Sequence, residues 1–253
     1  MDGNERGNAQ VNVLLLATFG LEIVETGGSL ALNARRDGRS EAAVLLARPE
    51  ARSQIERAAA ILSTAVRFLE GTYGEIEPSV ELKRRIVRVV REVRPEIVIA
   101  QDPEHSFEDL DPDRRPAMIL YLEALALAGR DWMIAECGGH APHAVRTLYY
   151  FRPHAPNCVV NVAPVWEQKK QALVELGSQL AFSGRHFRQT LGEELEHLVP
   201  GAAAMDDRTL GQAAHLELER ALHLYYGIPS HGHFVLAEPY RRAGSFQLEA
   251  LVV

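Results

Sequence analysis

Residues 11–17 read VNVLLLA, and residues 96–101 read EIVIAQ. Both runs are short and almost continuously apolar, which is typical of strands that are buried on both faces of a parallel sheet. A similar run, AAVLLA, occupies residues 42–47, and amphipathic segments separate these runs. The alternation of strand and helix predicts right-handed crossovers and a Rossmann-like, doubly wound α/β fold, with a mostly parallel sheet and helices on both faces.

The rest of the chain extends this pattern. Apolar spacing predicts helices over residues 27–36, 52–64, 80–93, 115–128, 165–182 and 208–225. Further strands are expected at residues 66–69, 147–151, 159–162 and 233–238. Residues 201–204 are interpreted as a linker between two late helices. A single domain over residues 1–253 is therefore predicted, with residues 1–10 flexible.

Composition and charge exclude several classes of protein. The 253 residues carry a formal charge of −7, which disfavours a long nucleic-acid groove. The N-terminal segment lacks the features of a signal peptide, and no stretch approaches about 20 apolar residues, so no membrane span is expected and the cytoplasm is the expected location. Cys137 and Cys158 are too few for a disulfide framework or a four-cysteine zinc site.

In doubly wound sheets, ligands bind beyond the carboxyl ends of the strands, near the point where the strand order reverses. The segments after the first and fourth predicted strands, residues 18–28 and 102–115, are therefore the expected functional segments. Gly27 and Gly28 open a helix in the first of them, but no phosphate-binding glycine motif is present. Nucleotide binding is not expected.

Both segments resemble the hallmark motifs of the PIG-L/LmbE family of zinc-dependent N-acetylglucosaminyl deacetylases. The family's first motif is Ala-His-Pro-Asp-Asp-Glu before a Gly-Gly helix start, and this chain has ATFGLE at residues 17–22 and GGSLA at residues 27–31. The second motif is an Arg-Pro-acid strand that leads to His-Pro-Asp-His, and this chain has RPEIV at 94–98 and DPDR at 111–114. Later family features match SQ at 178–179 and AEPYR at 237–241. The resemblance implies the LmbE-like three-layer α/β/α fold.

Carried across position by position, the resemblance implies that the zinc site is lost. The two zinc-binding histidines of the family fall on Thr18 and Arg114, and the zinc-binding aspartate falls on Leu21. The general-base aspartate falls on Gly20, and the histidine that stabilises the tetrahedral intermediate falls on Asp111. The retained residues are Glu22 and Asp113. The family's loop after the second strand is also contracted, because residues 47–50 run almost directly into a helix.

The chemistry shows what this loss implies. Zinc lowers the pKa of bound water from about 16 to about 7, and a shift of roughly 9 units corresponds to about 12 kcal/mol. Leucine and glycine have no donor atoms, and arginine stays protonated in proteins, so these side chains cannot hold the ion. We therefore expect no zinc cofactor and no deacetylase reaction of the usual kind.

Arg114 carries a positive charge at the position of a zinc ligand. The hypothesis is that its guanidinium replaces the charge of the metal and pairs with Glu22 or Asp113; the alternative is that it points to solvent. The ligand-binding candidates are Glu22, Arg52, Asp102, His105, Asp113 and Arg114. A replacement metal site is a further alternative, with the ligands Asp102, His105, His231 and His233.

Three functions remain open at this point. The first is a binding or partner protein that keeps the deacetylase scaffold, takes a small polar or anionic, sugar-like ligand, and assembles with itself or with an active relative. The second is a metal-dependent hydrolase of N-acetylglucosaminyl substrates with a non-standard ligand set. The third is a purely structural oligomer.

Overall fold

The computed structural model describes residues 10–228 and 232–244. Residues 1–9 of the segment that was expected to be flexible lie outside the described residues. No helix in these two ranges is long and apolar enough to cross a membrane.

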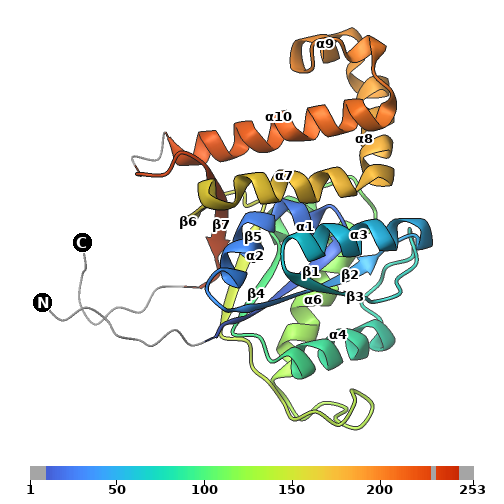
Figure 1. Ribbon diagram of the computed structural model, residues 1–253. Helices are drawn as coiled ribbons and strands as arrows, with labels where there is room; N and C mark the ends of the chain where they lie inside the picture. The colour runs from blue at the N-terminus through green and yellow to red at the C-terminus, as the bar shows by residue number, and fades with distance from the viewer. Residues whose placement is uncertain (1–9, 229–231, 245–253) are drawn as a thin grey trace, which may run out of the picture.

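The described strands form a seven-stranded sheet with the order β3-β2-β1-β4-β5-β7-β6 (Figure 1). They are β1 (Asn12–Phe19), β2 (Arg39–Leu46), β3 (Thr64–Phe68), β4 (Ile97–Gln101), β5 (Thr147–Phe151), β6 (Cys158–Asn161) and β7 (Ala237–Arg242). The first five strands pair in parallel, and β7 runs antiparallel between β5 and β6. The predicted doubly wound, mostly parallel sheet is confirmed, and its strand order reverses between β1 and β4.

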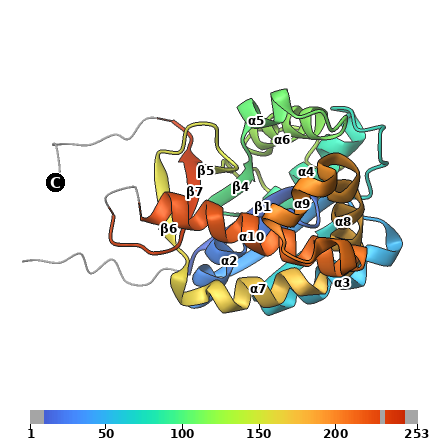
Figure 2. The ribbon, with the colours of Figure 1, turned by 90° about the horizontal axis from the view of Figure 1, so that it is seen from above.

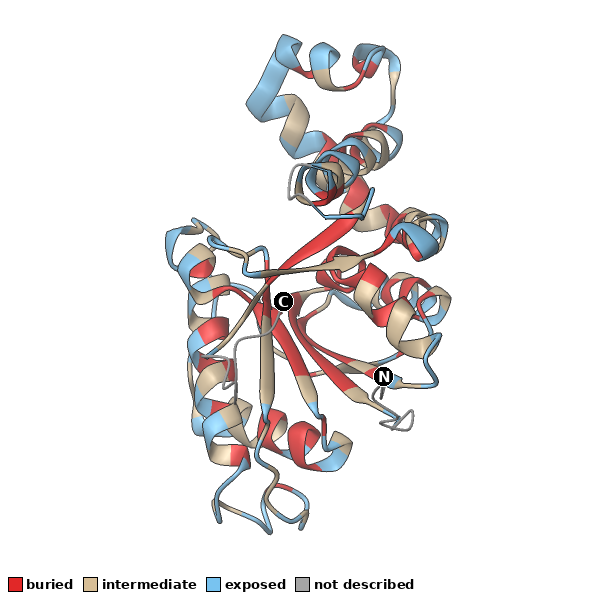
Figure 3. Cartoon of the chain, turned by 90° about the vertical axis from the view of Figure 1, so that its left-hand side faces the viewer, coloured by how far each residue is buried: buried red, intermediate tan, exposed pale blue. Residues whose placement is uncertain are grey.

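Helices cover both faces of this sheet, as Figure 3 shows. They are α1 (Glu22–Glu25), α2 (Gly27–Ala34), α3 (Pro49–Ile61), α4 (Val80–Val93), α5 (Pro103–Glu108), α6 (Arg114–Ala128), α7 (Trp166–Glu175), α8 (Gly177–Leu191), α9 (Leu195–Leu198) and α10 (Asp207–Gly227). Single 3₁₀ turns are η1 (Ala163–Val165), η2 (Gly192–Glu194) and η3 (Ala202–Ala204). The sequence did not predict the short helices α1, α5 and α9.

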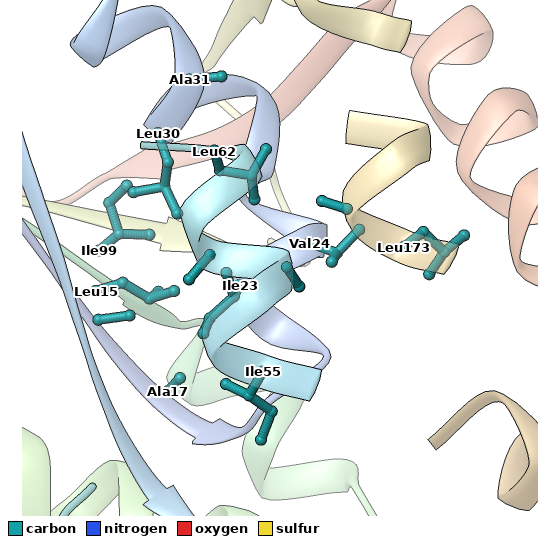
Figure 4. Packing of buried hydrophobic residues seen from close by; sticks show 14 of the residues in the cluster. Leu15, Ala17, Ile23, Val24, Leu30, Ala31, Ile55, Leu62, Ile99 and Leu173 are labelled. Carbon is teal, nitrogen blue, oxygen red and sulfur yellow. The ribbon is translucent and has the colours of Figure 1, made fainter. Parts of the chain in front are cut away.

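Strand β1 shows why the run at residues 11–17 is continuously apolar. Val13, Leu15 and Ala17 belong to the core that β1 shares with α1, α2, α3 and α7, part of which Figure 4 shows. Leu14 and Leu16 belong to the core on the opposite face, under α4 and α6. Because successive side chains of a strand point to opposite faces, a strand covered on both sides needs apolar residues at every position.

The prediction of one helix over residues 165–182 is wrong. The chain forms η1, α7 and α8 instead, and the helical path breaks between α7 and α8 at Leu176, where φ is −79° and ψ is 43°. Gly177 then begins α8 beside the guanidinium of Arg208, which would lie 2.9 Å from an added Cβ. Apolar periodicity continued through this break, so the sequence pattern did not reveal it.

The last predicted strand, residues 233–238, is also misplaced. Strand β7 spans Ala237–Arg242, and its pairing with β6 begins at Ala237 opposite Asn161. Phe234 and Val235 are exposed, and the carbonyl of Val235 lies against Gly227 at the end of α10. The backbone of residues 234–235 therefore lies beside the end of α10, before the strand begins.

Helix α10 packs against both α8 and β7, and Figure 2 shows it from above. It crosses α8 closely, since an added Cβ at Gly211 would lie 1.9 Å from the carbonyl oxygen of Leu180. The residues predicted as a linker at 201–204 hold the single turn η3 before α10. A small core of α9 and α10 residues lies beside this crossing.

Candidate functional site

The carboxyl ends of β1 and β4 lie side by side, because the strand order reverses between these two strands. Helix α1 begins at Glu22, three residues after Phe19 ends β1. This tight connection folds the Glu22 side chain back over the strand end, where Oε2 accepts a hydrogen bond of 2.6 Å from the backbone N–H of Thr18. Such a reversal point is where ligands bind in open α/β sheets.

Arg114 reaches this position from the first residue of α6. Its Nη1 atom donates hydrogen bonds of 2.6 Å to Oε1 of Glu22 and of 2.6 Å to Oε1 of Gln101. Its Nε atom lies 3.2 Å from Oδ2 of Asp109, and its guanidinium carbon lies 5.0 Å from the ring centroid of Phe19. The side chain is only 15% exposed, so the guanidinium lies over the ends of the strands rather than pointing to solvent. We call Glu22, Gln101, Asp109 and Arg114 the tip cluster.

Burial dominates the electrostatics of the tip cluster. It raises the pKa of Glu22 from 4.5 to about 7, although the positive charge of Arg114 opposes the shift. Burial alone would lower the pKa of Arg114, but Glu22 and the neighbouring acids outweigh it and keep the guanidinium charged. At neutral pH the pair therefore has a fixed cation and a carboxyl group that can still take up a proton.

Gly20 is the residue that the motif resemblance aligns with the general-base aspartate of the family. An added Cβ there would lie 2.5 Å from two side-chain atoms of Ile55, which belongs to the buried core beside Ala17 in Figure 4. The connection between β2 and α3 has two residues, because β2 ends at Leu46 and α3 starts at Pro49. An aspartate at this position would need Ile55 to move.

The residues present do not fit a catalytic zinc ion. At the three positions that the motif resemblance aligns with the zinc ligands, Thr18 has only a hydroxyl, Leu21 has no donor atom, and Arg114 carries a positive charge. Among the described residues, no group of three or more His, Cys, Asp or Glu side chains converges as metal ligands would.

Asp111 and Asp113 shape the loop that leads to α6. Oδ1 of Asp111 accepts a hydrogen bond of 2.9 Å from the backbone N–H of Asp113. The carboxylate of Asp113 accepts from the backbone N–H of Gly74, also at 2.9 Å. Of the two acids that the hypothesis named as partners of Arg114, Glu22 pairs with it. Asp113 pairs with the backbone of Gly74 instead.

Two other candidates have partners of their own. Asp102 is fully buried, caps α5, and accepts two hydrogen bonds of 2.8 Å from Arg241. Arg52 pairs with Glu70 at 2.5 Å on the surface of α3. Neither side chain belongs to the tip cluster.

The histidine candidates do not converge in the described part of the chain. His105 on α5 lies 3.9 Å from Asp109, and burial lowers its pKa together with the charge of Arg152. His233 is exposed beyond the end of α10. His231 lies outside the described residues.

Sequence reasoning missed three residues at this end of the sheet. Gln101 closes β4, where a polar side chain after an apolar run was the available signal. Glu25 lies one helical turn after Glu22, and Arg152 follows β5 and donates a hydrogen bond to Oε1 of Glu25. Burial would raise the pKa of Glu25, but Arg152 and then Arg114 outweigh it and hold that pKa below its usual value.

A second buried group of charges joins α7, α10 and β7. Lys169 Nζ lies 2.8 Å from Oε1 of Glu238 and 2.9 Å from Oε2 of Glu219, and it also lies 3.0 Å from Nε2 of His223. Glu238 also accepts hydrogen bonds from the backbone N–H groups of Gly28 and Ser29 at the start of α2. We call Lys169, Glu219, His223, Glu238 and Tyr240 the anchor cluster.

No protein-family model matches the chain. The diacetylchitobiose deacetylase of Thermococcus kodakarensis is 33% identical over 124 residues, which cover 47% of this chain and 45% of that relative. The match thus spans less than half of the length of that relative.

Solved structures with this fold cover almost the whole chain. The 4-carboxy-2-hydroxymuconate hydratase GalB of Pseudomonas putida is 20% identical with a TM-score of 0.66, over 96% of this chain and 100% of that chain. A conserved protein of Thermus thermophilus, TT1542, is 20% identical with a TM-score of 0.68, over 96% and 98%. The N,N'-diacetylchitobiose deacetylase of Pyrococcus horikoshii is 17% identical with a TM-score of 0.66, over 92% and 83%.

These comparisons confirm the resemblance that the motifs indicated. Similarity of fold extends over nearly the whole chain, and similarity of sequence to a deacetylase extends over about half of it. The chain has the fold of the PIG-L/LmbE deacetylases.

Proposed function

We propose that this protein is a non-catalytic binding protein built on the deacetylase fold, in which Arg114 replaces the catalytic metal. The observation that carries the proposal is the pair of 2.6 Å hydrogen bonds from Nη1 of Arg114 to Glu22 and Gln101. This guanidinium compensates the buried carboxyl group that the family motif retains. A divalent cation at the same place would be repelled by it.

The zinc ligands and the general base, which the motif resemblance implies are lost, are the groups that activate water in the family. Without a metal to lower its pKa, water at the strand ends lacks about 12 kcal/mol of activation. Glu22 is held by Thr18 and Arg114, and the position of the general base is a glycine packed against Ile55. We therefore propose that this end of the sheet holds a small polar, sugar-like molecule rather than hydrolysing one.

Metal content and turnover test this proposal together. The protein is purified with zinc in the growth medium, its metal content is measured by mass spectrometry, and amine release from N,N'-diacetylchitobiose is followed at neutral pH. We expect zinc well below one ion per chain and no release above the rate of the buffer. Stoichiometric zinc with turnover would reject the proposal.

The alternative is a metal-dependent N-deacetylase of N-acetylglucosaminyl substrates with a non-standard ligand set. The identity of 33% with a diacetylchitobiose deacetylase over 124 residues favours it. This alternative predicts that a chelator abolishes amine release and that added zinc restores it. In that case substitution of His105 would lower the zinc content, whereas a structural His105 would leave it unchanged.

Self-association is a further part of the proposal. Leu218, Leu222 and Tyr225 lie on one face of α10 and are 46%, 37% and 66% exposed. They continue the face that packs on α8 through Gly211 and Ala214, so we propose that a second copy of the chain covers them. Light scattering coupled to gel filtration should give a dimer or larger assembly, and Leu222→Glu should reduce its mass. A monomer at all concentrations would reject this part.

A further inference from the structure

A hollow of about 460 Å³ lies where the first three strands begin, at the opposite edge of the sheet from the tip cluster. This volume is within the range of sites that bind small molecules. Its wall comes from the starts of three parallel strands and from the end of α4, and includes Asn12, Arg39, Ser63, Ala65 and Val93. None of the residues that line it belongs to the tip cluster or to the family motifs. A ligand in this hollow would therefore be separate from the site at the reversal of strand order.

The period of two in a strand brings charged side chains of this wall to one face of the sheet. Arg39 and Glu41 are two residues apart in β2, so both side chains point to the face that α4 covers further along the strand, at Ala43. The register of the sheet places Asn12 beside Arg39 and Ala65 beside Glu41. Arg39 is exposed and Glu41 is partly exposed, so this part of the face is open to solvent.

Arg67 of β3 links the two acids of the wall. Its Nε atom donates to Oε1 of Glu41 at 2.5 Å, and its Nη1 atom donates to Oε2 of Glu92 at 2.7 Å. The hydrogen bond from Arg67 lowers the pKa of Glu92, which is therefore ionised at neutral pH. Among the described residues, no donor reaches the second oxygen of either carboxylate. The wall thus has two open acceptor oxygens.

Arg39 supplies open donors beside these acceptors. Within the described part of the chain, its guanidinium has no hydrogen bond and no ion pair, although Glu41 lies on the same face of the same strand. The Cα atoms of two such residues are about 7 Å apart. A guanidinium has five N–H donors in a planar fork that matches a carboxylate. The wall therefore has a free cation on one side and partly free carboxylates on the other.

The balance of charge selects the chemical class of the ligand. The charged side chains that line the hollow are two cations, Arg39 and Arg67, and two anions, Glu41 and Glu92. A simple anion on Arg39 would lie near two carboxylates, and a simple cation on the carboxylates would lie near a free guanidinium. A ligand with one charge of each sign avoids both repulsions. Charge complementarity thus favours a zwitterion.

From this arrangement we propose that the hollow binds a free α-amino acid with an aliphatic side chain. The carboxylate of the amino acid accepts hydrogen bonds from the guanidinium of Arg39, and its ammonium group donates to the open oxygens of Glu41 and Glu92. Val13 and Val93, which also line the hollow, supply apolar surface for the side chain. Such a site goes beyond the function proposed for the tip cluster, because the two share no residue.

Isothermal titration at pH 7 with L-leucine, N-acetyl-L-leucine and L-leucinamide tests the amino-acid site on the unsubstituted protein. The acetyl group removes the positive charge of leucine, and the amide removes its negative charge. We expect L-leucine to bind at least about tenfold more tightly than either derivative. Equal affinity for the three compounds, tighter binding of a derivative, or no detectable binding of L-leucine overturns the proposal.

Substitutions then locate the binding groups. Arg39→Gln should weaken binding of L-leucine at least about tenfold, and Glu41→Gln should weaken it by a smaller factor, because Glu92 still offers an acceptor. Arg36→Gln is the matched control, since Arg36 is an exposed arginine in the turn between α2 and β2 that does not line the hollow. Circular dichroism confirms that each variant is folded.

The result for Arg39→Gln decides the assignment, because Glu41→Gln also removes a partner of Arg67. Unchanged affinity for L-leucine in Arg39→Gln, or equal losses in Arg39→Gln and Arg36→Gln, overturns it.

Discussion

The tip cluster and the anchor cluster are both buried groups of charges above the same sheet, but they differ in how their central carboxyl groups, Glu22 and Glu238, are paired. Oε1 of Glu238 has Gly28 and Lys169 as partners, and Oε2 has Ser29 and Tyr240. Oε1 of Glu22 has Arg114 as its partner, and Oε2 has the backbone N–H of Thr18. Each cluster also has one buried atom without a hydrogen-bond partner among the described residues, Nε2 of Gln101 in the tip cluster and Oε2 of Glu219 in the anchor cluster.

The pKa values of the two central carboxyl groups, Glu238 and Glu22, shift in opposite directions. Burial would raise the pKa of Glu238, but Lys169 and His223 outweigh it and hold that pKa far below the usual range. Arg114 fails to do the same for Glu22, whose pKa stays raised. Glu238, which has more donors around it, is held as an ion, whereas Glu22, which pairs with Thr18 and Arg114, keeps a raised pKa. Residue type and burial alone do not distinguish the two.

Removal of the central cation should give the largest contrast. Lys169→Met leaves Glu219 and Glu238 buried without their counter-charge, and breaking a buried pair in this way costs about 3–5 kcal/mol. Arg114→Met should cost less, about 1–3 kcal/mol, because Glu22 can take up a proton in its place. Urea unfolding at pH 7 measures both values. Equal costs would show that Lys169 and Arg114 contribute equally to the free energy of unfolding.

The second largest effect concerns pH. Glu22 has a pKa of about 7 in the folded protein and 4.5 as its ordinary value, so between these values the folded state holds a proton that the unfolded state has lost. Its contribution to the free energy of unfolding is therefore present below pH 4.5 and is lost as the pH rises to about 7. At about 1.36 kcal/mol per unit, the loss approaches roughly 3 kcal/mol.

Glu22→Gln isolates this contribution. The difference in unfolding free energy between the protein and Glu22→Gln cancels the contributions of the other titratable groups, which both proteins share. This difference should change by roughly 3 kcal/mol between about pH 5 and 8. A difference that is independent of pH would mean that Glu22 is ionised throughout, and that the tip cluster is as well paired as the anchor cluster.

The two clusters were not equally accessible to sequence reasoning. The tip cluster follows strands that are recognisable from apolar runs, and a resemblance to known motifs placed Glu22 and Arg114 opposite each other. The anchor cluster joins Lys169, His223 and Glu238, which lie on two helices and the antiparallel strand of the second half. Contacts between such distant segments depend on packing that no local pattern encodes.

The same limit explains the errors in the fold. Parallel strands that are covered on both faces need apolar side chains at every position, so β1, β2 and β4 were recognisable. The apolar spacing continues through the break at Leu176, so the pattern predicted one helix. Strand β7 contains charged residues and Pro239, so it lacks the apolar pattern of the other strands. Gln101 and Glu25 were missed because their significance is an unpaired atom, which only coordinates reveal.

The contact between Gly20 and Ile55 gives a smaller effect. Gly20→Ala places a Cβ about where the Ile55 side chain now lies, 2.5 Å away, so overpacking should cost about 1–3 kcal/mol. In an Ile55→Val background the same substitution should cost less, because the smaller side chain leaves space. Urea unfolding of the four proteins measures this coupling. Additive costs would show that Ile55 does not fill the space beside Gly20.

The smallest expected effect is that of zinc on stability, which should be absent. A ligand that binds only the folded state at 100 times its dissociation constant adds about 2.7 kcal/mol to the free energy of unfolding, so even a weak site is detectable in a titration with zinc chloride. We expect no change for the unsubstituted protein, because Thr18, Leu21 and Arg114 do not provide a ligand set. The triple variant Thr18→His, Leu21→Asp and Arg114→His supplies three donors on the same strand ends, and its stability should rise with zinc concentration. If the unsubstituted protein responds as the variant does, the guanidinium of Arg114 does not exclude a metal, and the proposal that Arg114 replaces the metal in the tip cluster is rejected.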